Sequence, residues 1–400
     1  MRVAQINAVY EYSSTGRNVQ EMHHFLQKKF NSFVYCANYS DHSNQIFKTG
    51  NKLNYKIHAF LSRLFGLQSY FSYLSTRKLI KQLYRVSPNV VVLHNLHANY
   101  INLKLILKYL SRYDIPTVLV LHDCWFFTGH CCHYTEDKCY KWQTECKRCP
   151  ALKKYNISWF FDRSNRLFKD KKHLFQAIPR LGVVGVSDWI TNEAKKSILS
   201  KASVVTRIYN WIDFDIFYPR DVSIVKKKLF IRDEFIVLGV AQGWDEKKGL
   251  SRFITVAEHY PETKVILVGE IPKDCILLPN IIAVGTIHNI HQLAELYSLA
   301  DIFLNFSIQE TFGKAAAESL ACGTPLVVNN ATANPEIVGN CGIVVNNNNE
   351  KEIFDAIDLI RMRSKEYYRE ICIKRAKKFF SKEDNLMSYI DLFKDMQMIK

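Results

Sequence analysis

Two glutamates flank the start of one predicted helix in the second half of the chain. The apolar run 301–306 predicts a buried strand, and a helix is expected from about residue 312 to a left-handed cap at Gly323. Glu310 precedes this helix, Gly313 stands in the turn, and Glu318 lies about two turns inside the helix. A helix N-terminus binds anions, and a carboxylate hydrogen-bonds sugar hydroxyls strongly. The segment therefore predicts one site for phosphate and polyol together, as a nucleotide sugar requires.

Two ordinary roles compete with this interpretation. Glu310 could cap the helix, and Glu318 could lie on a solvated helix face. The wider context favours the ligand site. The run 310–313, followed by Glu318 and by 321–325, resembles the donor-site signature of the retaining group-1 (family four) glycosyltransferases.

This resemblance implies a GT-B fold and transfer of a sugar from a nucleotide diphosphate to an acceptor, with retention at the anomeric carbon. It implies that Glu310 binds hydroxyls of the transferred sugar and that Glu318 binds the ribose hydroxyls. It also places three further residues at the donor, namely Thr311, Phe312 and Gly313. No cofactor is needed for the chemistry in this family, and no carboxylate pair has to flank the anomeric centre.

Alternating strand and helix patterns must position these residues. Expected strands are 2–9, 32–37, 89–93, 117–122, 181–186, 235–241, 264–268, 281–284, 302–306, 326–328 and 343–345. Expected helices are 17–29, 55–64, 70–84, 103–113, 190–197, 250–259, 290–298, 313–321, 351–362, 365–380 and 384–397. Such alternation predicts an α/β protein with two Rossmann-like, doubly wound parallel sheets that face a cleft.

Three parts are expected along the chain. Residues 1–209 should form an acceptor-binding Rossmann-like domain, with a cysteine-rich insertion at 124–150. Residues 210–383 should form the nucleotide-sugar domain, because 208–219 is similar to the interdomain turn of the same family. The resemblance also implies that a last helix, in 384–400, crosses back to the first domain.

Ligands of open parallel sheets bind beyond the carboxyl ends of the strands, and this rule selects two residues in the first half. Gly16 should begin a helix after the first strand, which resembles the first glycine loop of the family. His122 ends an expected strand, and in the family a histidine at this strand end faces the transferred sugar and the acceptor. A buried structural histidine is the alternative, and Asp123 could orient His122, cap the next segment or contact the acceptor.

Lys248 is the candidate cation for a diphosphate leaving group. It follows the first strand of the second half, and Lys248 with Gly249 matches the phosphate-binding lysine and helix-starting glycine of the family. Many members carry an arginine five or six residues earlier, where this chain has Gly243 and Gln242. The lysine should then act with backbone amides alone, and Lys247 is the fallback cation.

Six of the 11 cysteines fall between 124 and 149. A C-x₂-C pair closes the cluster, which is a zinc-site spacing. Cys131 or Cys132, with Cys139, Cys146 and Cys149, could hold a structural zinc ion, and His133 is a reserve ligand. Free buried thiols or a disulfide pair are the alternatives. The aromatic residues around the cluster resemble a subset of these transferases assigned to polysaccharide assembly.

A formal charge of +16 on 400 residues points to anionic partners. No nucleic-acid motif accompanies it, so we expect no nucleic-acid binding. Basic and aromatic residues mix at 55–85 and 153–172, which favours peripheral contact with an anionic membrane surface. An ordinary helix with a buried aromatic face is the alternative.

The sequence also leads to expectations about the cellular location of the protein and the reaction that it catalyses. No apolar run approaches the ~18 residues of a membrane helix and no signal-peptide core appears, so we expect a cytoplasmic protein, peripheral on the inner face of the plasma membrane. The acceptor is expected to be a glycan, lipid-linked, in cell-surface polysaccharide biosynthesis. A nucleotide-sugar epimerase of the same architecture and a non-catalytic nucleotide-sugar-binding scaffold are the rival hypotheses.

Overall fold

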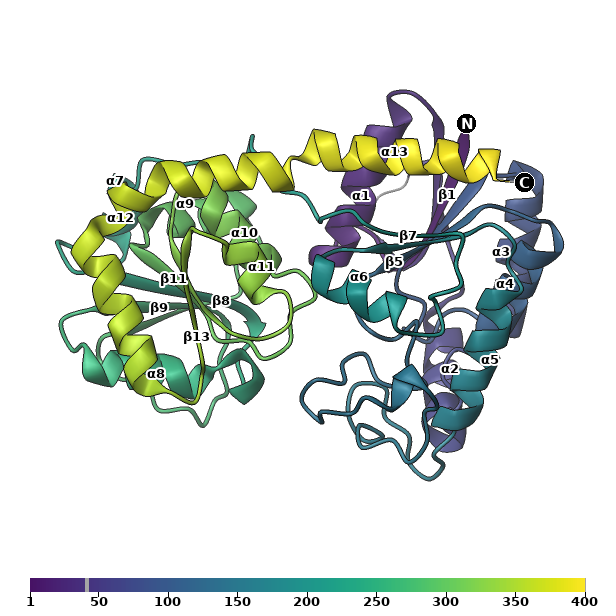
Figure 1. Cartoon of the computed structure of the whole chain (residues 1–400), viewed down its shortest axis with the longest axis horizontal. Coiled ribbons are helices and arrows are strands. Elements are labelled where there is room, and N and C mark those ends of the chain that lie inside the picture. The colour runs from purple at the N-terminus through teal and green to yellow at the C-terminus, as the bar shows by residue number, and fades with distance from the viewer. Residues whose placement is uncertain (40–42, 400) are drawn as a thin grey trace. The chain divides into compact units, whose positions relative to one another are not determined.

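A computed structural model describes residues 1–39 and 43–399 of the chain. Two compact units can be distinguished in it (Figure 1). Unit 1 combines Met1–Ile208 with the segment that begins at Leu386, and unit 2 is Tyr209–Asn385. Among the described residues, no helix combines the length and the apolar content that crossing a membrane requires.

A seven-stranded parallel sheet forms the centre of unit 1, in the order β3-β2-β1-β4-β5-β6-β7. Its strands are β1 (Arg2–Val9), β2 (Asn31–Asn38), β3 (Ile46–Lys48), β4 (Val90–Leu93), β5 (Thr117–Leu121), β6 (Leu181–Gly185) and β7 (Val204–Arg207). Its helices are α1 (Ser13–Gln27), α2 (Lys52–Phe65), α3 (Tyr73–Val86), α4 (Leu103–Arg112), α5 (Ser164–Gln176) and α6 (Asp188–Lys195). Strands such as β4 and β5 are buried throughout, because helices cover both faces of a doubly wound sheet.

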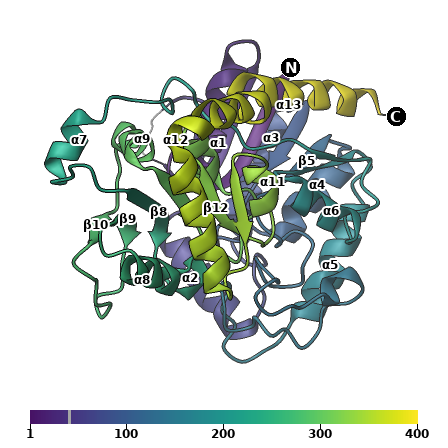
Figure 2. The same ribbon diagram turned by 60° about the vertical axis from the view of Figure 1, so that its left-hand side comes forward.

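Unit 2 contains a six-stranded parallel sheet in the order β10-β9-β8-β11-β12-β13. Its strands are β8 (Ile236–Gly243), β9 (Lys264–Glu270), β10 (Ile281–Gly285), β11 (Ile302–Asn305), β12 (Leu326–Asn329) and β13 (Gly342–Val345). Its helices are α7 (Ser223–Lys228), α8 (Leu250–His259), α9 (Ile290–Leu299), α10 (Lys314–Ala321), α11 (Asn334–Val338) and α12 (Glu350–Phe380). In both views α8 and α9 lie on opposite sides of β8 and β9 (Figures 1 and 2). The two predicted Rossmann-like parallel sheets are thus confirmed.

The last helix, α13 (Lys382–Met398), begins in unit 2 and ends in unit 1. Met396 is buried and lies against β6, where a Cβ on Gly182 would come within 3.0 Å of its Sδ. Gln397 Nε2 is 2.9 Å from the Sδ of Met1. The end of the chain therefore contacts its beginning inside unit 1. Two expected helices, 351–362 and 365–380, are one element with a non-helical residue between them, Ser364 at φ 66°.

Two strands of unit 1 were not predicted, namely β3 and β7. One expectation is also corrected. Trp159, Phe160 and Phe161 were placed in a basic-aromatic helix, yet α5 begins only at Ser164, whose backbone N–H bonds Asp162 Oδ1 at 2.8 Å. The aromatic residues therefore lie in the loop before the helix. Residues 122–163, between β5 and α5, contain one short 3-10 turn, η1 (Lys141–Gln143).

Candidate active site

The carboxyl ends of β8 and β11 lie at one edge of the unit 2 sheet. The two strands are parallel neighbours, paired through Ile302 and Val237. The chain leaves β8 into the 3-10 turn η2 (Glu246–Lys248), and it leaves β11 into the loop before α10. Short loops after neighbouring parallel strands must meet at this edge, so the sheet brings together residues that are about 60 positions apart.

Lys248 and Glu310 meet at this edge. Lys248 Nζ lies 2.6 Å from Glu310 Oε1 and 3.3 Å from Ser307 Oγ. The side chains are 37% and 22% exposed, so both ends of the pair are partly accessible to water or a ligand. The predicted leaving-group cation and the predicted sugar-binding carboxylate are therefore direct neighbours.

Backbone and amide hydrogen bonds hold the loop that carries Glu310. Its N–H donates to Thr332 Oγ1 at 2.9 Å, and its carbonyl accepts from Ala333 N–H at 3.2 Å. Asn334 Nδ2 donates to the carbonyl of Ser307 at 3.1 Å, and its Oδ1 accepts from Asn305 Nδ2 at 3.2 Å. The position of the carboxylate is thus set by the segment that follows β12.

Two glycines permit the local backbone. Gly313 has φ +87° and directly precedes α10. Gly249 has φ +79°, and a Cβ there would come within 2.5 Å of the Cβ of Phe306. Positive φ is costly for other residues, so each turn into its helix needs glycine. Gly323 also has the predicted left-handed conformation, at φ +79°.

A small cavity of about 40 Å³ lies beside the Lys248–Glu310 pair. Its polar lining residues are Lys248, Asn305, Glu310 and Lys314. Lys314 is the first residue of α10 and was not singled out from the sequence. Its position directly after Gly313 was the available signal. Because ligand pockets are typically ~300–1,000 Å³, the cavity has room for one group of a ligand only.

Glu318 lies apart from this cavity lining. The residue is 2% exposed, and its Oε2 accepts a hydrogen bond from the hydroxyl of Tyr297 at 3.0 Å. Phe312 is also buried, with its ring 5.3 Å from that of Phe380 and 6.0 Å from that of Tyr209. Thr311 is half-buried beside Glu310. Phe312 can therefore offer a ligand its backbone rather than its ring.

His122, in unit 1, belongs to a chain of hydrogen-bonded side chains. Gln5 Nε2 donates to the carbonyl of Val19 at 3.4 Å. The Gln5 amide oxygen, Oε1, can only accept, so His94 Nε2, 3.3 Å away, is the donor of their hydrogen bond. Burial holds the pKa of His94 well below its usual range, and the nearby His122 lowers it further, so the ring of His94 is neutral. Its Nδ1 must then accept from Nε2 of His122, 3.0 Å away. His94 was missed, although it follows β4 as His122 follows β5.

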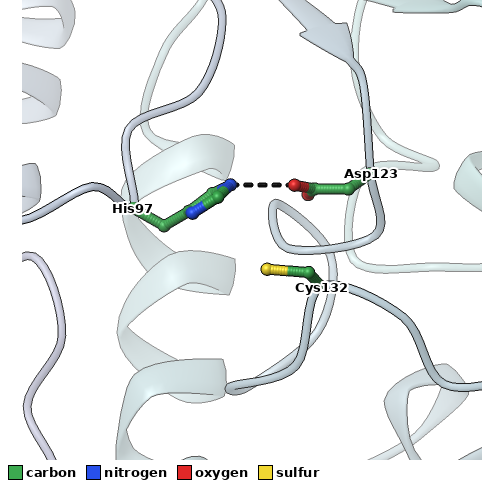
Figure 3. Close-up of side chains that lie close together, drawn as sticks. All are labelled: His97, Asp123 and Cys132. Atoms are coloured by element: carbon green, nitrogen blue, oxygen red, sulfur yellow. Dashed lines mark hydrogen bonds and ion pairs between the residues drawn. The ribbon is translucent and has the colours of Figure 1, made fainter. Parts of the chain in front are cut away.

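Asp123 pairs with His97, which was also not singled out. Asp123 Oδ2 is 2.8 Å from His97 Nε2, and its Oδ1 accepts from the backbone N–H of Trp125 at 2.8 Å. Burial alone would raise the pKa of Asp123, but His97 and the hydrogen bonds lower it to about 2. Figure 3 shows His97 pointing to Asp123, with Cys132 beside the pair. These three residues offer ligand atoms within 4.8 Å of one another.

Gly16 lies inside the first helix rather than at its start. The helix α1 begins at Ser13, three residues before the expected position, so this expectation is corrected. A Cβ on Gly16 would come within 3.2 Å of a methyl group of Val9, and the Gly16 carbonyl accepts from the N–H of Glu11 at 3.1 Å. The absence of a side chain at Gly16 thus allows the start of α1 to pack against the end of β1.

The cysteines of the insertion separate into two groups. Cys131, Cys139, Cys146 and Cys149 line one cavity of about 10 Å³. Cys132 lies beside Asp123 and His97, and its carbonyl accepts a hydrogen bond from the backbone N–H of Cys124 at 2.8 Å. His133, the reserve ligand, packs against Tyr155, with ring centroids 5.8 Å apart. All of the cysteines are free thiols in this structure. Among the described residues, only the set with His97, Asp123 and Cys132 has three ligand atoms within 4.8 Å of one another.

Comparison with known proteins shows what the part of the chain around this site is similar to. The family described as Glycosyl transferases group 1 matches residues 221–379, which contain β8 to β13 and the Lys248–Glu310 pair. The O-antigen chain mannosyltransferase B of Escherichia coli is 32% identical over 105 residues, or 26% of this chain and 27% of that protein. The chain spans between 25% and 45% of the length of the curated relatives it matches.

Solved structures resemble the chain over its full length. The sucrose-phosphate synthase of Thermosynechococcus elongatus has a TM-score of 0.71 at 14% identity, with 100% of both chains covered. The Anabaena protein Alr3699/HepE, solved in complex with UDP and glucose, has a TM-score of 0.66 at 14% identity and covers 99% of this chain and 100% of its own. At such identities the likeness shows the fold. The chain therefore has the GT-B fold, and its residues 221–379 match the glycosyl transferases group 1 family.

Proposed function

We propose that the chain is a retaining hexosyltransferase that moves a sugar from a nucleoside diphosphate to an acceptor glycan. The contact of Lys248 with Glu310 at the start of α10 carries the proposal. A cation for the diphosphate and a carboxylate for the sugar are the two groups that an activated sugar needs side by side. The names of relatives add support, since one is named an O-antigen chain mannosyltransferase and a protein of similar fold was solved with UDP and glucose.

In this proposal Lys248 changes partner during the reaction. Without donor, its ammonium is neutralised by Glu310 and bonded to Ser307. A bound diphosphate competes for the ammonium, which leaves Glu310 able to accept hydrogen bonds from sugar hydroxyls. When the bond to the anomeric carbon breaks, negative charge develops on the leaving phosphate. Lys248 and the N-terminal amides of α10 then stabilise that charge.

Lys314 supplies a second positive charge in place of the arginine that many relatives carry. It lines the same cavity as Lys248 and Glu310, and it begins the helix whose N-terminus faces the donor in this proposal. The leaving-group site would then contain two lysines, one from the loop after β8 and one from α10. The leaving-group site would thus have the positive charge that an arginine usually supplies, although this chain has Gln242 and Gly243 at the usual arginine positions.

Glu318 keeps its proposed role as the ribose contact under one condition. Its carboxylate is buried and bonded to Tyr297, so a ribose can reach it only through the oxygen that Tyr297 does not use, after the side chain becomes accessible. His122 is proposed to face the sugar and acceptor while its Nε2 is bonded to His94.

A thermal-shift panel of nucleoside diphosphate sugars tests the proposal. A true donor at a hundred times its dissociation constant should stabilise the protein by about 2.7 kcal/mol. We expect Glu318→Ala to remove this shift. Glu310→Gln should abolish turnover while retaining the shift given by the bare nucleoside diphosphate. If both variants respond to every ligand as the parent does, these roles are wrong.

Product analysis separates the transferase from its rivals. With donor and a lipid-linked glycan acceptor, the anomeric signal of the product in NMR should have the donor's configuration. An altered sugar nucleotide formed without acceptor would identify an epimerase instead. Donor binding without turnover, with crude lipid acceptors supplied, would identify a scaffold.

We also propose that unit 1 binds an anionic membrane surface, where a lipid-linked acceptor would be found. A groove of about 1250 Å³ runs along α3 and α4. Its basic lining residues are Lys48, Arg77, Lys78, Lys81, Lys108 and Arg112. Aromatic rings lie among them, as in Tyr73, whose ring is 5.5 Å from the Arg77 guanidinium. Basic and aromatic side chains together suit anionic headgroups.

Vesicle co-sedimentation tests this surface. Binding to vesicles that contain phosphatidylglycerol should exceed binding to pure phosphatidylcholine, and it should weaken with salt. We expect Arg77→Glu with Lys81→Glu to abolish it. Lys227→Glu with Lys228→Glu is the matched control, because these exposed lysines lie on α7 in unit 2. Equal binding by the two double variants would reject the groove as the contact.

A further inference from the structure

The cysteine insertion, residues 122–163, is a long loop with a buried interior. Apart from η1 it has no regular element, yet Trp125, Phe127 and Trp142 are each at most 1% exposed. A long loop of this kind lacks the hydrogen-bond ladders that fix helices and strands. Its compact shape therefore requires another constraint, and all of its cysteines are unpaired thiols.

We propose that Cys131, Cys139, Cys146 and Cys149 bind a structural zinc ion. This site lies outside the Lys248–Glu310 site and does not depend on the proposed transfer reaction. The four side chains line one cavity of about 10 Å³, although Cys131 and Cys149 are 18 positions apart in the sequence. That volume accommodates a single water-sized sphere, so an ion fits and a side chain does not. Four thiolates are a usual ligand set for structural zinc.

Buried polar atoms without partners gather around this cavity. His130 Nε2 and Trp142 Nε1 are buried, and neither has a hydrogen-bond partner among residues 1–39 and 43–399. Both residues line the cavity with the four cysteines. An indole N–H can only donate, and a metal-bound thiolate is a far better acceptor than a thiol. Zinc binding, which releases the thiol protons to solvent, would supply acceptors where the structure has unsatisfied groups.

The backbone around the cysteines is already arranged for a sulphur ligand. Gly129 N–H donates to Cys146 Sγ at 3.2 Å. A Cβ on Gly129 would come within 2.8 Å of the Cβ of Cys146 and 2.4 Å of the carbonyl oxygen of Ser164. Only glycine allows this approach, so the N–H···S bond and the loop path depend on one another. Such bonds to sulphur hold a metal ligand in place.

The positive charge near the cavity balances a four-thiolate zinc site, which carries two negative charges. Lys141 and Lys147 line the cavity, and the ammonium of Lys147 also pairs with Glu145 at 3.0 Å. Lys171 is 1% exposed, and its Nζ donates to the carbonyls of Trp125 and Thr128 at 2.6 and 3.0 Å. A buried ammonium is costly unless an anion lies near it. The metal site would provide that anion in the insertion, whose carbonyls already accept hydrogen bonds from Lys171 on α5.

The neighbours Cys131 and Cys132 have different surroundings, and this supplies a matched control. Cys131 lines the cavity, whereas Cys132 lies near His97 and Asp123. Among the described residues, no three of the four proposed ligands have sulphurs within 4.8 Å of one another. Because zinc–sulphur bonds are ~2.3 Å, metal binding must draw the thiols together. We expect the loop to contract around the ion while Cys132 stays where it is.

Metal content of the full-length chain, purified without chelator, tests the site. We expect about one zinc per chain by elemental analysis, and its loss in Cys131→Ser and in Cys149→Ser. Cys132→Ser should retain the metal. After replacement by cobalt(II), the wild type and Cys132→Ser should show the intense visible bands of a tetrahedral thiolate site. Because the spectrum reports on the ligands directly, it remains decisive if a serine variant folds poorly.

Three results would overturn the proposal. Zinc below about a tenth of an equivalent in the wild type would show that the thiols hold no metal. Loss of zinc in Cys132→Ser, with retention in Cys131→Ser, would place the ion at His97 and Asp123 instead. A disulfide between any two of the four cysteines, found by mass spectrometry of the purified protein, would identify a covalent cross-link.

Discussion

The Lys248–Glu310 site and the cysteine insertion both follow central parallel strands, but they are held in place differently. The loops after β8 and β11 are short and return quickly to helices, and left-handed glycines and asparagine side chains fix their paths. The insertion after β5 runs for about 40 residues with one 3-10 turn. A short loop takes its geometry from the sheet, whereas a long loop must contain its own cross-links.

This comparison predicts that changes in the first region act on chemistry and changes in the second act on local order. Lys248→Ala tests the first part of this prediction, the effect on chemistry, and should have the largest effect of all. We expect kcat/KM to fall by about 100- to 1000-fold, the usual cost of removing one group that stabilises developing charge. The variant should fold normally, because the side chain is 37% exposed. Steady-state kinetics with the donor found by thermal shift measures the loss.

Lys247→Ala is the matched control for that variant. Lys247 is the neighbouring residue but does not line the cavity beside Glu310. Its kcat/KM should stay within about threefold of the parent, because less than 1 kcal/mol of transition-state stabilisation is at stake. Equal losses in the two variants would show that this turn contributes only general positive charge.

Gly249→Ala should give the next largest effect, on stability. The backbone has φ +79°, and the new Cβ would meet the Cβ of Phe306 at 2.5 Å. We expect about 3 kcal/mol of destabilisation in urea unfolding, from left-handed strain together with overpacking. Gly285→Ala is the control, because Gly285 has φ +72° but open space around it, and it should lose only about 1 kcal/mol. Similar losses in both would mean that Phe306 moves aside.

Gly129→Ala separates the two regions. The new methyl group would press on Cys146 and on the Ser164 carbonyl, at a cost of about 2 kcal/mol. We expect faster proteolysis within residues 122–163 and a lowered zinc content. The stabilisation by a bare nucleoside diphosphate should stay unchanged. If that ligand response disappears as well, the insertion and the donor site are not independent.

The smallest predicted effect concerns pH. Burial lowers the pKa of His58 in α2 from 6.5 to about 4, and its Nδ1 lies 2.6 Å from Ser72 Oγ. The unfolded chain takes up the proton below pH 6.5 and the folded chain only near pH 4, so stability is lost as the pH falls between these values. We expect His58 alone to cost unit 1 about 1 to 2 kcal/mol between pH 7 and pH 5. His58→Gln should flatten this dependence in urea titrations, and an unchanged slope would contradict the assignment.

Sequence reasoning predicted both sheets and the two residues of the ion pair for the same reason. Lys248 and Glu310 each stand five residues after an apolar strand ends, so the apolar pattern and their positions together identify the sheet edge on which they lie. The supporting bonds could not be foreseen. Thr332 and Asn334 reach the Glu310 loop from beyond the next strand, and nothing in the local sequence marks which polar side chain will do so.

The unit 1 residues show a second limit. His122 was identified, but its partner His94 and the Asp123 partner His97 were not, because such pairing depends on which strands are neighbours. The choice between Cys131 and Cys132 was left open for a similar reason. Adjacent residues in a loop face different surroundings, and no periodic pattern reveals which. The burial of Glu318 against Tyr297 likewise depends on how α9 and α10 pack.

The contact between Gln397 and Met1 has a consequence for engineering the chain. Unit 1 is made of two pieces, Met1–Ile208 and the segment from Leu386, while unit 2 is one piece. A short linker between Gln397 and Met1 would turn unit 1 into a single continuous polypeptide that starts at Leu386 and ends at Ile208. Circular permutation would thus allow unit 1 and unit 2 to be expressed separately, each with every strand of its own sheet.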